Sequence, residues 1–181
     1  MIIALYDTNV LISGTFWRGM PRLLIRLARK KQIQFVTCQA LLDELQSVLI
    51  RPDKSFRLSQ AEAALIADDV LTYASLVAPT REITVCRDLD DNLVSACALA
   101  GHAEYLVTGD PDLLVLEKYE GISIVKVRDF VKTFLSEHYQ RYRHGEVSFG
   151  RLTEELGMTT WGLSHLLEEF GWPVSNLPAA Y

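Results

Sequence analysis

The sequence predicts an α/β fold, with helices on both faces of a five-stranded, mainly parallel sheet and a small helical appendage at the C-terminal end. Two observations predict this three-layer α/β/α arrangement. Short apolar segments without polar alternation recur along the chain, as in strands that are buried on both faces of a sheet. Segments with helical periodicity separate them, which is the order of elements in a doubly wound sheet. We place the main domain at residues 1–145 and the appendage at residues 146–181.

Each predicted strand is a short apolar segment that ends at a polar or turn-forming residue. The first strand stops at Asp7 and the third at Pro79, which cannot continue a central strand. The five predicted strands are Ile2–Tyr6, Ile33–Cys38, Leu76–Ala78, Tyr105–Thr108 and Ile122–Val127. No Gly-rich phosphate-binding loop follows any of them, which excludes the common nucleotide-binding functions of such a sheet.

The predicted helices lie between these strands. Leu23, Leu24 and Leu27 mark the apolar face of the first, and Pro52 ends the second, which begins at Gln39. The others are a helix opened by the capping box Ser59–Glu62 and extending to about Tyr73, an alanine-rich helix from Asp90 to a C-terminal cap at Gly101, a helix after Gly109–Asp112, and a long helix from Asp129 to about Tyr142.

Composition is that of a soluble globular protein, and we expect a cytoplasmic one. Hydrophobic residues make up 49% and charged residues 23% of the 181 residues. No basic segment of a secretion signal is found, and no apolar segment approaches the ~18 residues of a membrane span. Cys38, Cys86 and Cys97 lie in apolar surroundings, which predicts buried free thiols in a reducing compartment.

The net charge of −5 is unevenly distributed. Residues 146–181 hold one basic and five acidic side chains, so the first 145 residues keep 17 of the 18 basic and 18 of the 23 acidic ones. Seven of those acids cluster at predicted strand ends and helix starts, and without them this part is net positive by 6. Such a surface is compatible with a nucleic-acid partner.

The clustered acids point to a metal site. Asp7 follows the first strand, Glu44 lies early in the helix after the second, and Asp110 follows the fourth. In a doubly wound sheet these places share the carboxyl edge, and a 3-2-1-4-5 order puts strands one and four at the switch point. Gathered like charges need protons or cations, and oxygen ligands without His or Cys suit Mg²⁺ or Mn²⁺. The remaining acids of the group are Asp88, Asp90, Asp91 and Asp112.

Each acid also has a purely structural interpretation. Asp7 begins a turn or caps a helix, and Asp110 precedes Pro111 in the manner of an N-cap. Asp90 suits the N-cap of the alanine-rich helix, which leaves Asp91 as the expected ligand.

Helical geometry separates the two neighbouring acids of the second helix. At ~100° per residue, Glu44 lies beside the apolar face set by Leu41 and Leu45, whereas Asp43 points nearly opposite. We therefore expect Glu44 to face the crevice and Asp43 to be solvated.

Four segments resemble the motifs of PIN domains, in order, over roughly residues 1–135. They are Asp7-Thr-Asn-Val-Leu-Ile-Ser, Leu42-Asp-Glu-Leu-Gln-Ser-Val-Leu, Arg87-Asp-Leu-Asp-Asp-Asn-Leu-Val and Tyr105-Leu-Val-Thr-Gly-Asp-Pro-Asp-Leu-Leu. The chain is most similar to the VapC-like toxins of prokaryotic toxin–antitoxin systems. Leu89 departs from the family pattern, because close relatives often have proline there, and the choice among Asp88, Asp90 and Asp91 stays open.

The resemblance implies a divalent-metal-dependent ribonuclease with an antitoxin protein as partner. One or two Mg²⁺ or Mn²⁺ ions would activate a water for attack on an RNA phosphodiester. The alternative is a non-catalytic or inhibited PIN-like regulatory protein, which an assay of divalent-dependent RNA cleavage would distinguish. Carried over by position, the acidic quartet is Asp7, Glu44, Asp91 and Asp110, with Asp112 as a further metal ligand and Asn9 and Thr108 as supporting polar residues.

Four arginines follow Asp7 at spacings of one helical turn. Arg18, Arg22, Arg26 and Arg29 predict a basic helix face, and we expect it to contact RNA phosphates. A solvated helix face explains the same spacing equally well.

Residues 146–181 lie outside the resemblance. Two short helices, Ser148–Gly157 and Thr159–Phe170, resemble a helix-turn-helix and also the helical segments of small antitoxins. Arg151 is the only basic residue of residues 146–181 against five Glu, which argues against the alternative that the two helices bind DNA. We expect the tail to pack on a PIN body, its own or that of a second subunit in a homodimer or higher oligomer, through Phe149, Leu152, Leu156, Trp161, Leu166 and Phe170.

Overall fold

The computed structural model describes residues 1–54, 56–79 and 89–174, and of residues 89–91 only the helical backbone. Its contacts divide the chain into two compact units, Met1–Phe130 and Val131–Tyr181. The predicted Cys86 and Asp88 lie outside the described residues. The domain boundary predicted after residue 145 stays a prediction.

A six-stranded sheet with the order β3-β2-β1-β4-β6-β5 forms the centre of the first unit. Five strands are parallel, and they confirm the predicted mainly parallel sheet and its strand order around β1. The sequence does not predict the antiparallel edge strand β5, because two residues carry no periodicity. The strands are β1 (Ile2–Tyr6), β2 (Ile33–Cys38), β3 (Ala74–Val77), β4 (Tyr105–Val107), β5 (Lys118–Tyr119) and β6 (Ile122–Val125).

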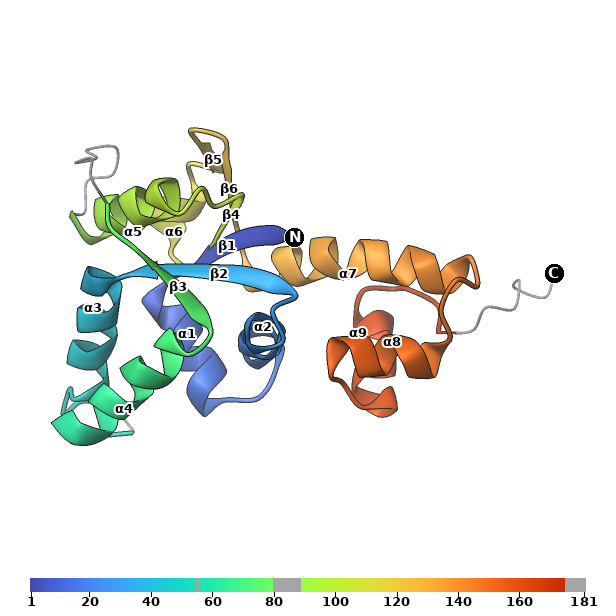
Figure 1. Cartoon of the computed structure of the whole chain (residues 1–181), viewed down its shortest axis with the longest axis horizontal. Coiled ribbons are helices and arrows are strands. Elements are labelled where there is room, and N and C mark those ends of the chain that lie inside the picture. Colours follow the sequence, from blue (N-terminus) through green and yellow to red (C-terminus); the bar gives the residue numbers. More distant parts are fainter. Residues whose placement is uncertain (55, 80–88, 175–181) are drawn as a thin grey trace. The chain divides into compact units, whose positions relative to one another are not determined.

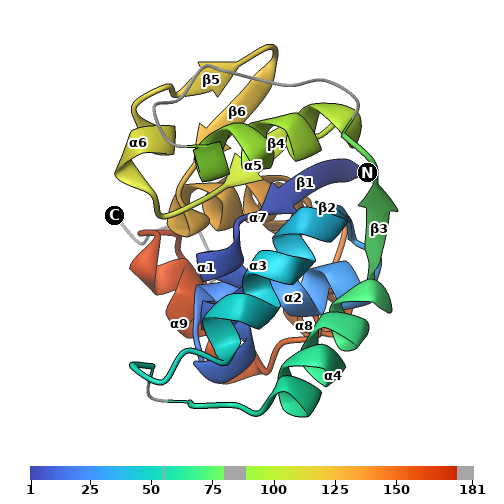
Figure 2. The same cartoon turned by 90° about the vertical axis from the view of Figure 1, so that its left-hand side faces the viewer.

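Helices cover both faces of this sheet. Figure 1 shows α5 and α6 on one side and α1, α2 and α4 on the other, and Figure 2 shows the same layers after a quarter turn. The predicted capping box at Ser59 and Glu62 is present and opens α4. The helices are α1 (Thr8–Phe16), α2 (Met20–Arg29), α3 (Gln39–Leu49), α4 (Gln60–Leu71), α5 (Leu89–Ala100) and α6 (Pro111–Leu114).

Alternate residues of the central strands build the core on the two faces of the sheet. On one face Tyr6 stacks on Phe35, with ring centroids 4.7 Å apart, and Phe130 meets Tyr6 edge-on at 6.4 Å. On the other face Leu5 packs in a cluster that includes the buried free thiols of Cys38 and Cys97. Both thiols match their prediction.

Helix α1 is the element that the sequence predicts least well. Only its first turn carries a recognisable signal, because Asp7 is a good N-cap. The helix is rich in β-branched residues and glycine, which are poor helix formers, and it has no polar face to create a period. Its buried residues are Thr8, Val10, Leu11, Ile12 and Gly14.

The ends of α5 differ from their prediction. The helix begins at Leu89, so Asp90 lies inside its first turn and not at the predicted N-cap. At the other end the helix stops before Gly101, but the residue with left-handed backbone is His102, with a φ of 51°. Gly101 is instead required by close packing, because a Cβ there would lie 2.7 Å from Cγ2 of Val36 on β2.

The second unit contains α7 (Val127–Arg143) from Val131 onward, together with α8 (Phe149–Leu156) and α9 (Thr160–Glu169). The two predicted short helices are confirmed, and Gly157 between them is left-handed, with a φ of 64°. Tyr139 stacks on Trp172 at 4.8 Å and Tyr142 contacts Phe149 at 5.3 Å. The tail therefore packs on the end of α7, residues that we had assigned to the main domain.

Most apolar residues of the tail are buried. Leu152, Leu156, Leu166 and Phe170 are buried, whereas Trp161 is 78% exposed. Packing of the tail on residues 1–130 or on a second subunit stays a prediction. Within the described residues, no helix combines the length and the apolar character needed to cross a bilayer.

We predict that Gly101→Ala destabilises the protein by about 1–3 kcal/mol, because the added methyl group must displace Val36 in a close-packed core. Urea unfolding of the purified variant measures this. Gly109→Ala is the control in the same unit: a Cβ at Gly109 meets nothing within 4 Å, so its unfolding free energy should stay within about 0.5 kcal/mol of wild type. Equal effects of the two substitutions would contradict the packing explanation.

Candidate functional site

Two of the predicted acids, Asp7 and Asp110, come together where β1 and β4 end side by side. Tyr6 at the end of β1 pairs with Val107 at the end of β4, and the N–H of Asp7 donates to the carbonyl of Val107 at 3.1 Å. Because β2 lies on one side of β1 and β4 on the other, this is the switch point of the sheet, where ligands bind in open α/β folds.

Thr108 joins the two aspartates at this point. Its hydroxyl donates to Oδ2 of Asp7 and accepts the backbone N–H of Asp110 at 2.9 Å. Both Asp7 and Thr108 are buried, so the hydrogen bonds form away from bulk water. The structure thus brings Asp7, Thr108 and Asp110 together.

Both aspartates also cap helices, as the structural interpretation expects. Oδ1 of Asp7 accepts the N–H of Val10 at 2.8 Å at the start of α1. Oδ1 of Asp110 accepts the N–H of Asp112 at 2.8 Å at the start of α6, whose first residue is Pro111. A carboxylate offers about four acceptor positions, so capping does not exhaust either of them.

Glu44 reaches the site through Thr8, a residue that our sequence analysis did not single out. The hydroxyl of Thr8 donates to Oε2 of Glu44 at 2.8 Å, which links α3 to the residue next to Asp7. Glu44 is half-buried and Asp43 is exposed, as their positions on the helix predict. The position of Thr8, directly after Asp7, is the only signal in the sequence that could have identified it.

Among the described side chains, those of the other predicted site residues make no hydrogen bond to Asp7, Thr108 or Asp110. Asp112 is exposed on α6 and contributes its backbone N–H to Asp110. Asn9 is exposed on the first turn of α1. The side chains of Asp90 and Asp91 lie outside the described residues, so the choice between them stays a prediction.

Burial and charge both act on Asp7. Burial raises the pKa of its carboxyl, because the charged form loses hydration, and the nearby Asp110 raises this pKa further. The hydrogen bond from Thr108 and the N–H groups of Val10 and Gly109 act in the opposite direction. A cation beside the two carboxylates would remove their repulsion.

The oxygen donors present suit Mg²⁺ or Mn²⁺. Mg²⁺ is commonly held by one or two carboxylates and several waters, and Asp7 and Asp110 supply two carboxylates with unused acceptor positions. Among the described side chains, no three His, Cys, Asp or Glu residues gather closely enough to form a protein-only metal site. The donor set therefore fits a cation bound largely through water.

Three of the four predicted arginines lie on α2. Arg18 stands in the connection before α2 and so does not belong to the predicted helix face. Arg29 forms an ion pair with Asp69, and its guanidinium lies 4.9 Å from the ring centroid of Tyr73. A cavity of about 410 Å³ is lined by Gly14, Thr15, Arg22, Ile25, Arg26, Arg29, Asp69 and Tyr73.

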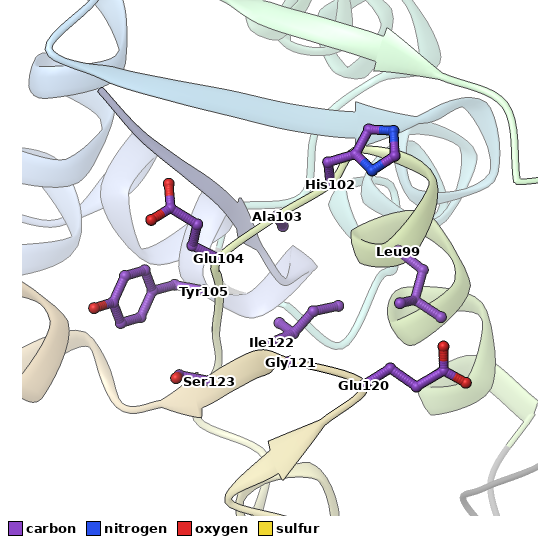
Figure 3. A pocket seen from close by; sticks show the side chains of 9 residues that line it. All are labelled: Leu99, His102, Ala103, Glu104, Tyr105, Glu120, Gly121, Ile122 and Ser123. Carbon is purple, nitrogen blue, oxygen red and sulfur yellow. The ribbon is translucent and has the colours of Figure 1, made fainter.

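A second cavity, of about 480 Å³, lies at the amino-terminal ends of β4 and β6, away from Asp7. Figure 3 shows that Glu104 and Tyr105 point to one side of it and Leu99 and Glu120 to the other, so its polar groups do not converge. None of the predicted site residues lines this cavity.

Comparisons with known proteins identify a family. The sequence model of the PIN domain matches residues 4–112. A chain in the crystal structure of VapBC2 from Rickettsia felis bound to a DNA fragment from their promoter matches with a TM-score of 0.49 and 15% sequence identity, over 69% of this chain and 98% of that chain. No curated protein matches the sequence.

The matched segment begins within β1 and ends at the start of α6, and it contains Asp7, Glu44, Thr108 and Asp110. It covers well over half of the 181 residues. The chain therefore belongs to the PIN domain family.

Proposed function

We propose that the protein is a divalent-metal-dependent endoribonuclease that hydrolyses RNA phosphodiester bonds. Its active site would lie at the carboxyl ends of β1 and β4. The observation that supports this most is the hydrogen-bonded group of Asp7, Thr108 and Asp110 at the switch point. Two carboxylates held together at the ligand-binding edge of a sheet repel each other, which does not stabilise the fold. They are well placed to bind a cation, which in turn can bind a phosphate.

In this proposal the residues of the site have different roles. Asp7 and Asp110 hold the metal, with Glu44, Asp91 and Asp112 as the further ligands expected from the family motifs. Thr108 fixes the orientation of Asp7, and the N–H of Asp110 in turn fixes the oxygen of Thr108. Thr8 orients Glu44 in the same way. When bound, Mg²⁺ or Mn²⁺ lowers the pKa of a coordinated water and neutralises charge on the phosphodiester.

A non-catalytic PIN-like protein is the second candidate. The capping bonds of Asp7 and Asp110 favour it, because they give both acids a role in the fold that requires no metal. The two candidates differ in whether the purified protein cleaves RNA when Mg²⁺ or Mn²⁺ is supplied.

We also propose that the protein is the toxin of a toxin–antitoxin system, and this assignment and that of its partners are based on the motif resemblance alone. In that proposal an antitoxin protein binds the chain and restrains the nuclease, and the chain forms a homodimer or higher oligomer. The acidic tail, with one basic and five acidic residues, suits a protein partner better than DNA.

We predict that Asp7→Asn abolishes RNA cleavage and that EDTA abolishes it in the wild type. Asparagine caps helices as well as aspartate does, so the substitution removes the charge and largely keeps the start of α1. The rate should fall by more than the roughly 10- to 100-fold expected for loss of a supporting partner. Cleavage of a labelled single-stranded RNA at several Mn²⁺ concentrations measures it.

The control for this prediction is Asp43→Asn, which removes an exposed charge next to Glu44 and should leave the rate near that of wild type. Full activity of wild type in EDTA, or of Asp7→Asn in Mn²⁺, would reject the metal-dependent mechanism. A wild type without activity would leave the non-catalytic candidate.

We predict that Thr108→Val lowers the cleavage rate by roughly 10- to 100-fold, because it removes the hydroxyl that orients Asp7. Thr108→Ser keeps the hydroxyl and should recover most of the rate. The same assay compares the two variants at saturating Mn²⁺, after thermal melting has shown that both are folded. Equal rates for valine and serine would show that Thr108 does not position Asp7.

We predict that neutralising Arg22 and Arg26 together weakens RNA binding and flattens its salt dependence, by a slope of about 0.7 for each lost phosphate contact. Arg29 is left in place because it pairs with Asp69. Lys118→Gln, an exposed residue on the edge strand β5, is the control. Unchanged affinity at both low and high salt would mean that the arginines form only a solvated face.

A further inference from the structure

Three aromatic rings meet where the end of α1 lies against the connection between α3 and α4. Phe16 stacks on Phe56 with centroids 4.7 Å apart and an interplanar angle of 11°. Trp17 meets Phe16 edge-on at 5.9 Å and Phe56 at 6.3 Å. We call Phe16, Trp17 and Phe56 the aromatic cluster.

The aromatic cluster is open to solvent. Trp17 is 50% exposed, and Phe16 and Phe56 are half-buried. Exposed apolar side chains are common singly, but several contiguous rings mark an interaction site. Within the described residues Trp161, which is 78% exposed, stacks only on His165, so it is not part of a group of three rings.

Basic residues flank the aromatic cluster in the sequence. Arg18 follows Trp17, and Arg51 and Arg57 are exposed on either side of Phe56. Residues 8–42 contain six basic and no acidic side chains, and Asp53 is the only acid in residues 45–57. Exposed arginines therefore adjoin both Trp17 and Phe56.

Two helices connect this cluster to the candidate site. α1 starts beside Asp7 and ends at Phe16, so the cluster lies about 14 Å along the helix axis from the carboxylates. α3 carries Glu44 and leads to the segment of Phe56. Figures 1 and 2 both show the end of α1 and the segment after α3 on the side of this unit turned away from the sheet. The separation corresponds to roughly two to four nucleotides of a strand.

We infer that the aromatic cluster stacks unpaired bases of a single-stranded RNA whose backbone continues toward Asp7 and Asp110. Rings surrounded by cations match a strand that alternates flat bases with phosphates, which is how single-stranded nucleic acids are held. An apolar protein partner would desolvate the same cations without pairing them. Contact with a second copy of this chain, whose tail is acidic, is an outcome that the test below distinguishes. The inference rests on the proposed function for the cleavage of the bound RNA, but the binding of RNA to the aromatic cluster does not depend on it.

The test measures binding of a fluorescein-labelled oligouridylate by anisotropy in EDTA, where cleavage does not occur. Trp17→Ala should weaken the affinity about tenfold, and Trp17→Phe should keep most of it, because the stacking ring remains. Phe56→Leu should weaken binding and Phe56→Tyr should not. Trp161→Ala removes an even more exposed tryptophan from the second unit and is the matched control, with unchanged affinity expected.

A double-stranded RNA of the same length supplies the second comparison. Its bases are already stacked, so Trp17→Ala should leave its affinity unchanged. Equal affinity of wild type and Trp17→Ala for the single strand would overturn the inference, as would an equal loss for single and double strands. A change of oligomeric state in Trp17→Ala, with unchanged RNA affinity, would show that the cluster contacts a second copy.

The outcomes also separate this inference from the proposed function. Trp17-dependent binding without cleavage in Mn²⁺ would support the stacking site and reject the nuclease. Asp7-dependent cleavage with no effect of Trp17 or Phe56 on affinity would support the nuclease and reject the stacking site.

Discussion

Repulsion between two carboxylates at the ends of neighbouring strands is the constraint around which the carboxyl edge is built. Asp7 and Asp110 come from strands that the sheet order makes adjacent. One hydroxyl, that of Thr108, donates to the first and accepts from the backbone of the second. The starts of α1 and α6 satisfy one oxygen of each aspartate. The fold therefore tolerates the charges without neutralising them, and so leaves room for a cation.

The sequence predicts the sheet well because its signal is local. The strands β1 and β2 are apolar segments with abrupt ends, and their bounds agree with the structure. The sequence could distinguish the half-buried Glu44 from the exposed Asp43, because the helical period determines the side of a helix on which each residue lies. Thr8 could not be recognised, since its role depends on a partner 36 residues away. Gly101 was assigned to capping because its contact with Val36 is equally invisible in the sequence.

Capping and metal binding are compatible roles for the same aspartate. A cap uses one oxygen and holds the carboxylate in one orientation, which lowers the cost of ordering it for a ligand.

The tail shows a different limit of sequence analysis. Its apolar residues indicate a packing surface, but not that Tyr139 and Tyr142 at the end of α7 would meet Trp172 and Phe149. Aromatic residues on one long helix give no sign of which segment covers them.

The distribution of charge along the first helices has a kinetic consequence. Residues 8–42 carry six positive charges and no negative one, while Asp7 and Asp110 meet at the carboxyl edge. An approaching polyanion is attracted by the positive face over a Debye length of about 8 Å at physiological ionic strength. Under the proposed function, diffusional capture and orientation of an RNA strand precede its contact with Asp7 and Asp110, even though the molecule as a whole bears a net charge of −5.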